Sequence, residues 1–272
     1  GLDHSDDHRL GLWSYDDKGS EYFTLRVRDL ETGQDLEDMI TETVGGGVWD
    51  QSGRSFFYVK RDENLRPSKV YHHLIGTDPA QDRPVYEEAD PSFYVGLGRT
   101  TSKRFITIQC HDHQSSECYL IDAAKPASAP RLIAKREAEV EYYLDDLGDG
   151  RLILLTNIDG AADFKLMSAP IDHPGRENWR DHVPYEAGRL IKSMSAYKHH
   201  LVWLETRNAL PRIVIQRLDD GATHSIAFDE EAYSLGLSSG YEYDTSEIRV
   251  SYSSMTTPLQ NYDYHMETRE RI

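Results

Sequence analysis

The stretch Asp149-Gly150-Arg151-Leu152-Ile153-Leu154-Leu155 places an Asp/Gly turn directly before an unbroken apolar run. A turn followed by a short apolar strand pattern recurs six times, at steps of 45, 49, 48, 48 and 48 residues. The repeats begin near Arg9, Arg54, Lys103, Arg151, His199 and Glu247. A period in the forties without helical periodicity is typical of a β-propeller with one blade per repeat. The sequence therefore predicts an all-β fold of about six four-stranded blades.

The strands inside each repeat follow the same order. In the third repeat, residues 105–108 and 119–121 form a predicted hairpin. Several predicted strands are apolar on consecutive residues, as expected for strands covered on both faces. The outermost strands are more polar, and Pro84 fits an edge strand because such a strand can lack one donor. Residues 36–40 fit either one helical turn or the outer strand of a blade.

We expect residues 1–272 to form a single propeller without a second domain. The predicted blade units are 1–44 (partial), 45–89, 90–137, 138–185, 186–228 and 229–272. The first unit is expected to lack a full innermost strand, because its turn, Ser5 to His8, lies almost at the terminus. Only a remnant of that strand is expected at Gly1 and Leu2, as if upstream sequence had been removed.

Composition limits the classes of partner. The net charge is −17, from 47 acids and 30 bases, which argues against a nucleic-acid partner. A negative field attracts cationic ligands, although an acidic surface can also serve solubility alone. No apolar run reaches the length of a membrane span, and no signal peptide is visible. With only Cys110 and Cys118, a disulfide scaffold is not expected, so the cysteine count favours a cytosolic or nuclear location, of which the cytoplasm is predicted.

One segment matches a catalytic motif by spacing alone. Gly236-Leu237-Ser238-Ser239-Gly240 has the G-x-S-x-G pattern of a hydrolase nucleophile elbow. That motif requires a sharp strand-to-helix turn, and here another strand is predicted to follow. We therefore interpret it as a chance match.

Two clusters offer metal-ligand side chains. Cys110, His111, His113 and Cys118 could supply a tetrahedral zinc site, but their spacing matches no standard finger. We favour solvated loop histidines and free thiols that face each other across a hairpin. The second cluster lies at the N-terminus and contains Asp3, His4, Asp6, Asp7 and His8. A frayed, solvated terminus is preferred there over a divalent-cation site.

Two histidine pairs, His72-His73 and His199-His200, lie in predicted strands. Adjacent strand residues point to opposite faces, so neither pair can act as one site, and packing or surface placement is expected. Gly45-Gly46-Gly47 precedes a strand instead of a helix, which argues against a phosphate cradle. No nucleophile, base and oxyanion donors assemble within the chain.

Short segments inside the repeats carry a more specific signal. Together they resemble the oligopeptidase B (protease II) group of the prolyl oligopeptidase family of serine peptidases. The resemblance runs in the same order through nearly the whole chain and rests on residues 62–67, 70–77, 85–88, 100–104 and 252–258.

This resemblance implies a seven-bladed propeller that caps a C-terminal α/β-hydrolase domain of the same native chain. The family's catalytic serine, aspartate and histidine lie in that hydrolase domain, so no catalytic residue is assigned here. Substrate-binding residues are unassigned, and neither a metal nor a cofactor is expected. The chain alone is expected to be inactive.

The implied role is a gate that admits short peptides, which this group cleaves after Arg or Lys. The negative charge would then attract basic peptides, and exposed blade edges would favour self-association. The main alternative is a stand-alone protein-interaction propeller without catalysis. A sugar- or metal-binding propeller is a third, weaker option.

Overall fold

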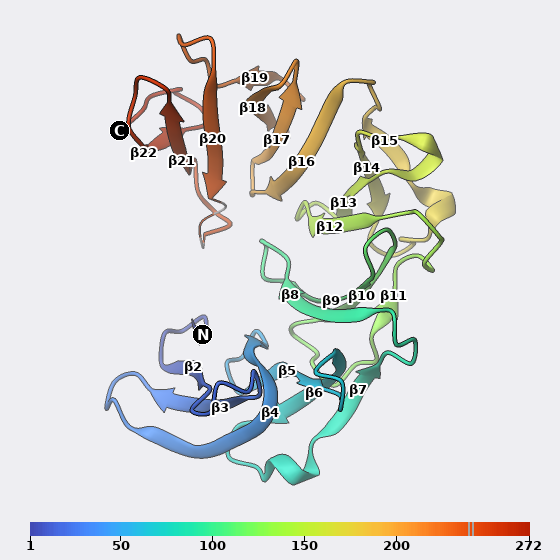
Figure 1. The fold of residues 1–272 in the computed structure, drawn as a ribbon, viewed down its shortest axis with the longest axis vertical. Coiled ribbons are helices and arrows are strands. Elements are labelled where there is room, and N and C mark those ends of the chain that lie inside the picture. The colour runs from blue at the N-terminus through green and yellow to red at the C-terminus, as the bar shows by residue number, and fades with distance from the viewer. Residues whose placement is uncertain (239, 241) are drawn as a thin grey trace. The chain divides into compact units, whose positions relative to one another are not determined.

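The computed structural model describes residues 1–238, 240 and 242–272. They form an all-β protein of antiparallel sheets with three single-turn 3₁₀ helices, which confirms the predicted fold class (Figure 1). Within the part of the chain that is described, no helix is long and apolar enough to cross a bilayer. The chain divides into two compact units, Gly1–Glu139 and Val140–Ile272.

The first unit contains a seven-stranded sheet, a four-stranded sheet and one 3₁₀ helix, η1 (Pro79–Gln81). The seven-stranded sheet comprises β1 (Leu2–His4), β2 (Leu10–Tyr15), β3 (Phe23–Asp29), β4 (Asp35–Trp49), β5 (Ser55–Arg61), β6 (Pro67–Leu74) and β7 (Arg83–Glu87). The four-stranded sheet comprises β8 (Tyr94–Arg99), β9 (Phe105–His111), β10 (Ser116–Asp122) and β11 (Arg131–Leu132). Strands adjacent in sequence are adjacent in each sheet, so every connection is a simple meander.

Strand β4 explains the seven-stranded sheet, because it pairs with a different neighbour at each end. Its first part pairs with β3, and its last part pairs with β5 after a register shift between Thr43 and Gly47. Gly47 has no space for a side chain: an added Cβ would lie 2.9 Å from the Phe57 carbonyl oxygen. Residues 36–40 are therefore a strand and not a helical turn. The glycine run continues the same strand, across the blade boundary expected between residues 44 and 45.

The N-terminus is more ordered than the sequence indicates. Residues Leu2–His4 form β1, a short first strand that pairs with β2 through Leu2↔Trp13, Asp3↔Leu12 and His4↔Gly11. The expectation of no more than a remnant at Gly1 and Leu2 understated this strand, because backbone pairing needs no apolar side chain and leaves no apolar pattern.

The second unit contains three antiparallel sheets. Their strands are β12 (Tyr142–Asp146), β13 (Arg151–Thr156), β14 (Lys165–Pro170) and β15 (Arg180–Val183), then β16 (Arg189–Ala196), β17 (His200–Arg207), β18 (Leu210–Arg217) and β19 (Thr223–Ser225), and finally β20 (Tyr233–Ser238), β21 (Glu247–Ser254) and β22 (Gln260–His265). Two 3₁₀ helices, η2 (Ile158–Gly160) and η3 (Arg176–Asn178), flank β14. Among the described residues the last sheet has three strands, whereas a complete sixth blade was expected. The division into blade units stays a prediction.

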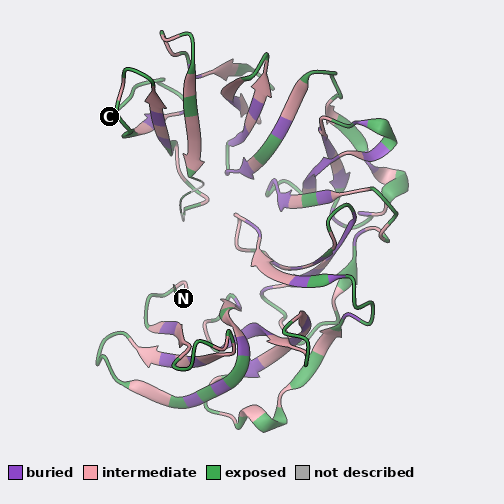
Figure 2. Ribbon diagram, in the orientation of Figure 1, coloured by how far each residue is buried: buried purple, intermediate pink, exposed green. Residues whose placement is uncertain are grey.

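The core lies between the faces of neighbouring sheets within each unit. The middle strands carry most of it, and β13 is buried at every position from Leu152 to Thr156 (Figure 2). This agrees with the unbroken apolar pattern expected of a strand covered on both faces. In the first unit, Phe57 and Val59 of β5 pack in one cluster with Ile106 and Ile108 of β9. Adjacent sheets within a unit are therefore held together by apolar contacts.

Candidate functional site

One cluster of buried carboxylates in the first unit surrounds Arg136, in the segment after β11. Its Nη2 lies 2.5 Å from Glu88 Oε2 and 2.9 Å from Glu117 Oε1. Its guanidinium also stacks over the Phe93 ring, 3.8 Å from the centroid. Glu88 accepts a further hydrogen bond from the Tyr86 hydroxyl. One arginine thus pairs with two buried carboxylates, Glu88 after β7 and Glu117 in β10.

The same cluster shows where the predicted cysteine and histidine hairpin differs from a metal site. Cys110 and Cys118 are buried and form no disulfide, as expected, whereas His111 and His113 are exposed. Burial raises the pKa of the Cys110 thiol to about 12, so it is protonated and a poor metal ligand. Its nearest potential co-ligands are Glu88 and Glu117 instead of the histidines. Because Arg136 already pairs with both carboxylates, this group is a structural ion cluster.

The pair His72-His73 points to opposite faces of β6, as expected. His72 stacks on Phe57 and its Nε2 lies 2.8 Å from Ser55 Oγ. His73 is fully buried, with Nε2 2.9 Å from Asp38 Oδ1 and Nδ1 3.0 Å from both carboxylate oxygens of Asp82. Each ring nitrogen of His73 therefore has a carboxylate partner. The expectation of packing is confirmed, and the two buried acids were missed because they lie 35 and 9 residues away.

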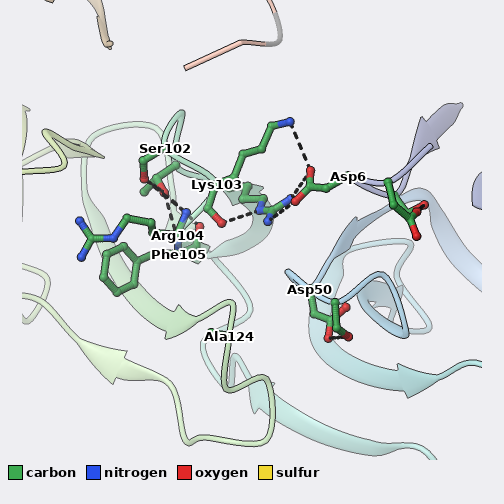
Figure 3. A network of polar contacts seen from close by, with 12 residues as sticks. Asp6, Asp50, Ser102, Lys103, Arg104, Phe105 and Ala124 are labelled. Atoms are coloured by element: carbon green, nitrogen blue, oxygen red, sulfur yellow. Dashed lines mark hydrogen bonds and ion pairs between the residues drawn. The ribbon is translucent and has the colours of Figure 1, made fainter. Parts of the chain in front are cut away.

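The acidic N-terminal segment is held in place by cations and is not frayed. Asp6 forms a two-pronged pair with Arg99, at 3.1 and 2.9 Å, and Lys103 Nζ lies 3.2 Å from Asp6 Oδ1 (Figure 3). Asp7 accepts a hydrogen bond from Ser5 Oγ. The predicted fraying is therefore wrong, because Arg99 at the end of β8 and Lys103 in the turn after it both hold Asp6. Asp3, His4, Asp7 and His8 are exposed, as expected of a solvated segment. Asp6 is therefore already paired with two cationic side chains.

The second unit contains a small cavity lined by charged side chains, which we call the His200 cavity. Its volume is about 80 Å³. The ionisable side chains that line it are His200, Arg217, His224, Glu267 and Arg269. His200 begins β17 and is 2% exposed, whereas its neighbour His199 is exposed. The sequence placed this histidine in a strand but contained no signal for the arginines beside it, since Arg217 ends β18 and Arg269 follows β22.

The G-x-S-x-G segment lies in a setting that fits no nucleophile elbow. Ser238 is the last residue of β20, while Ser239 and Tyr241 lie outside the described residues. In the described residues that follow, no helix begins before β21. Ser238 is exposed, and none of its recorded contacts is to a histidine. The interpretation as a chance match therefore stands, and no catalytic residue is assigned to this chain.

Comparison with known proteins gives a match along the whole chain. The family model described as "Prolyl oligopeptidase, N-terminal beta-propeller domain" matches residues 1–272. Dipeptidyl aminopeptidase BI of Pseudoxanthomonas mexicana is 39% identical over 268 residues, which cover 98% of this chain and 37% of that protein. Protease 2 of Moraxella lacunata is 29% identical over 272 residues, covering 97% of this chain and 38% of the relative.

Solved structures agree with this assignment. Oligopeptidase B from Leishmania major superposes with a TM-score of 0.93 at 26% identity, covering all of this chain and 40% of that one. Oligopeptidase B from Trypanosoma brucei, solved with covalently bound antipain, gives a TM-score of 0.91 at 29% identity and 39% coverage of its own chain. The present chain thus spans less than half the length of these relatives, and over its full length it belongs to the prolyl oligopeptidase family, as the N-terminal β-propeller domain.

Proposed function

We propose that this chain is the gating domain of a serine oligopeptidase that hydrolyses short peptides after Arg or Lys. Its partner is a C-terminal α/β-hydrolase domain of the same native chain, in the cytoplasm. The observation that carries the proposal is the match of residues 1–272 to the family's propeller, in relatives of which this chain covers only 37 to 40%. The propeller restricts substrates by size, and the hydrolase domain supplies the nucleophile.

The specificity after Arg or Lys is supported by two oligopeptidase B structures and by the net charge of −17. A negative surface raises the rate at which cationic peptides meet the protein. Dipeptidyl aminopeptidase BI, at 39% identity, points to a second activity. It differs from an endopeptidase in requiring a free amino terminus.

One assay of the full-length protein separates these two activities. The substrates are N-terminally blocked peptides with Arg or with citrulline, its neutral isostere, before the scissile bond, and the same peptides unblocked. We expect the blocked Arg peptide to be cleaved with a kcat/KM at least about tenfold above that of the citrulline peptide, since one charged hydrogen bond accounts for that factor. Cleavage restricted to unblocked peptides would instead assign the aminopeptidase activity, and equal rates for Arg and citrulline would refute the basic specificity.

The contribution of charge is tested by ionic strength. Capture by a negative field weakens as salt screens it, with a Debye length of about 10 Å at 0.1 M. We expect kcat/KM for a basic peptide to fall between 0.02 and 0.3 M salt, while kcat/KM for a neutral peptide stays level. Parallel changes for the two peptides would remove the steering role.

The alternative, a stand-alone interaction propeller, is separated by the gene sequence downstream of Ile272. A G-x-S-x-G segment followed by Asp and then His supports the peptidase, and a stop codon supports the scaffold. We further expect the 272-residue chain alone to leave arginyl esters intact. Hydrolysis that persists after a second purification step would contradict the placement of the nucleophile in another domain.

A further inference from the structure

The His200 cavity contains a buried polar atom without a partner. His200 Nε2 lies 2.9 Å from Glu267 Oε1, and the imidazole is 2% exposed. Its other nitrogen, Nδ1, is buried and makes no hydrogen bond. Buried polar side-chain atoms are nearly always satisfied, so an orphan atom beside a cavity indicates a missing ligand or water.

The protonation of the ring decides what Nδ1 can bind. Glu267 offers only acceptor oxygens, so Nε2 carries the proton and donates it. Burial lowers the pKa of His200 below its ordinary value, while Glu267 acts in the opposite direction and His199 and Arg217 add to the lowering. The ring is then neutral at pH 7 and above, and Nδ1 is a hydrogen-bond acceptor. The orphan atom therefore requires a donor.

The other side chains around the cavity favour an anion. Burial lowers the pKa of His224, and the positive charges of Arg269 and Arg217 add to this effect, whereas Glu267 opposes it. Arg217 is shared with Asp219, Asp220 and Glu267. Among the residues that the structure describes, no carboxylate pairs with Arg269. This arginine is therefore available to an incoming anion.

A ligand that fits must combine negative charge, acceptor oxygens and one hydrogen-bond donor in a few heavy atoms. The volume of about 80 Å³ is far below the roughly 300 Å³ of sites for drug-sized molecules. Hydrogen phosphate meets these conditions, because its oxygens accept from Arg269 and its P–O–H donates to His200 Nδ1. We propose that the His200 cavity binds hydrogen phosphate. This proposal is independent of the peptidase activity.

Because Nδ1 of His200 is a hydrogen-bond acceptor, the site should favour anions that carry a proton over anions that do not. Sulfate has the same shape as phosphate but carries no proton at neutral pH. It therefore leaves Nδ1 of His200 unsatisfied, and its oxygens are repelled by the lone pair of that nitrogen. A phosphomonoester above its second pKa of about 6 has also lost its proton. At pH 8 inorganic phosphate is the only one of these three anions whose oxyanion group retains a hydroxyl donor, so it should bind more tightly than sulfate and O-phosphoserine.

The test is isothermal titration calorimetry of the full-length protein at pH 8 with inorganic phosphate, sulfate and O-phosphoserine. We expect the Kd of phosphate to be at least about tenfold lower than that of sulfate, since an unsatisfied buried acceptor costs that factor. O-phosphoserine should bind as weakly as sulfate. Equal affinity for phosphate and sulfate, or no phosphate binding at millimolar concentration, would overturn the proposal.

Variants connect the binding to named atoms. Arg269→Gln should raise the Kd of phosphate about tenfold, because one charge-assisted hydrogen bond is lost. Arg131→Gln, on the exposed strand β11 of the other unit, removes the same charge and should leave the Kd unchanged. An equal effect of both variants would reduce the binding to net charge and contradict a built site.

His200→Gln tests the selectivity itself. We expect the ratio of the sulfate Kd to the phosphate Kd to fall toward one. If this variant does not fold, the wild-type protein gives the same information through pH. As the pH is lowered through the imidazole range, Nδ1 gains a proton and becomes a donor, so sulfate affinity should rise toward that of phosphate. A ratio that is constant from pH 8 to the lowest pH at which the protein is folded would refute the role of His200.

Discussion

The two buried histidines of this chain, His73 in the first unit and His200 in the second, show how similar sequence patterns acquire different roles. Each is the second residue of a His-His pair in a strand region, and each is at most 2% exposed. Both ring nitrogens of His73 face carboxylates, whereas His200 has one carboxylate and one orphan nitrogen beside a cavity. A buried imidazole with two partners is part of the structure, and one with a single partner retains capacity for a ligand.

The same contrast applies to the charges around them. In the first unit, buried acids are matched within the protein, as Glu88 and Glu117 are by Arg136. In the second unit, the acid that meets His200 is Glu267, whose side chain is 41% exposed. Removing a partner should therefore cost much more in the first unit, where the remaining charge cannot be rehydrated.

The largest effect is expected for Arg136→Gln. This change leaves Glu88 and Glu117 buried without their cation, which should lower the free energy of unfolding by about 3 to 5 kcal/mol. Urea unfolding followed by tryptophan fluorescence measures the loss. Arg131→Gln, exposed in the same unit, is the control and should cost less than about 0.5 kcal/mol. A loss below about 1 kcal/mol for Arg136→Gln would show that the cluster behaves as a surface pair.

A second effect is expected for His73→Gln. The glutamine amide has one nitrogen where the imidazole has two, so it cannot occupy both donor positions, and one of Asp38 and Asp82 loses its partner. We expect a loss of about 2 to 3 kcal/mol in the same measurement. His199→Gln, on an exposed histidine, should change stability by less than about 0.5 kcal/mol. If the His73→Gln and His199→Gln variants were equally stable, His73 would not be stabilising Asp38 and Asp82.

A smaller effect is expected for His200→Gln, about 1 kcal/mol at pH 7.5, because Glu267 is partly exposed and regains water. The stability cost of this substitution should depend on pH in a definite direction. The folded-state pKa of His200 is lowered, so below about pH 6.5 the unfolded chain binds the proton more readily and the wild type loses stability. The cost of the substitution should therefore shrink as pH falls from 7.5 to 5. A cost that grows on acidification would show that the folded state prefers the charged ring.

The smallest effect is expected for Lys103→Gln, at most about 0.5 kcal/mol, since its pair with Asp6 is partly exposed. Arg99 still neutralises Asp6 through two hydrogen bonds, so Arg99→Gln should cost more than Lys103→Gln. Differential scanning calorimetry at low and high salt compares the unfolding temperatures of the Lys103→Gln and Arg99→Gln variants. The reverse order would mean that Lys103 anchors the N-terminal segment.

Much of the fold was predictable because its signal is local. The apolar runs at 105–108 and 152–155 predicted strands that the structure contains as β9 and β13. The ambiguity at 36–40 was not resolved by sequence, since the outcome depends on pairing with β3. The order at Leu2–His4 was missed for a related reason, because it comes from backbone hydrogen bonds to β2.

The candidate sites were less predictable. The sequence identified the metal-ligand types at Cys110 and His111, but the hairpin turned the thiol inward and the imidazole outward. It gave no signal for Arg136 or for Arg269, because a charged residue in a loop shows no periodicity. Their importance comes from partners that are distant along the chain.

The sequence by itself determined the all-β class, the repeat and the family, because strand patterns and the family's characteristic segments depend on residues that are close together along the chain. Only the tertiary structure decided which histidine is satisfied and which is left with an orphan nitrogen. The physical reason is that desolvation and pairing depend on groups brought together from separate strands, as Asp38 and Asp82 are around His73 and as Glu267 is beside His200.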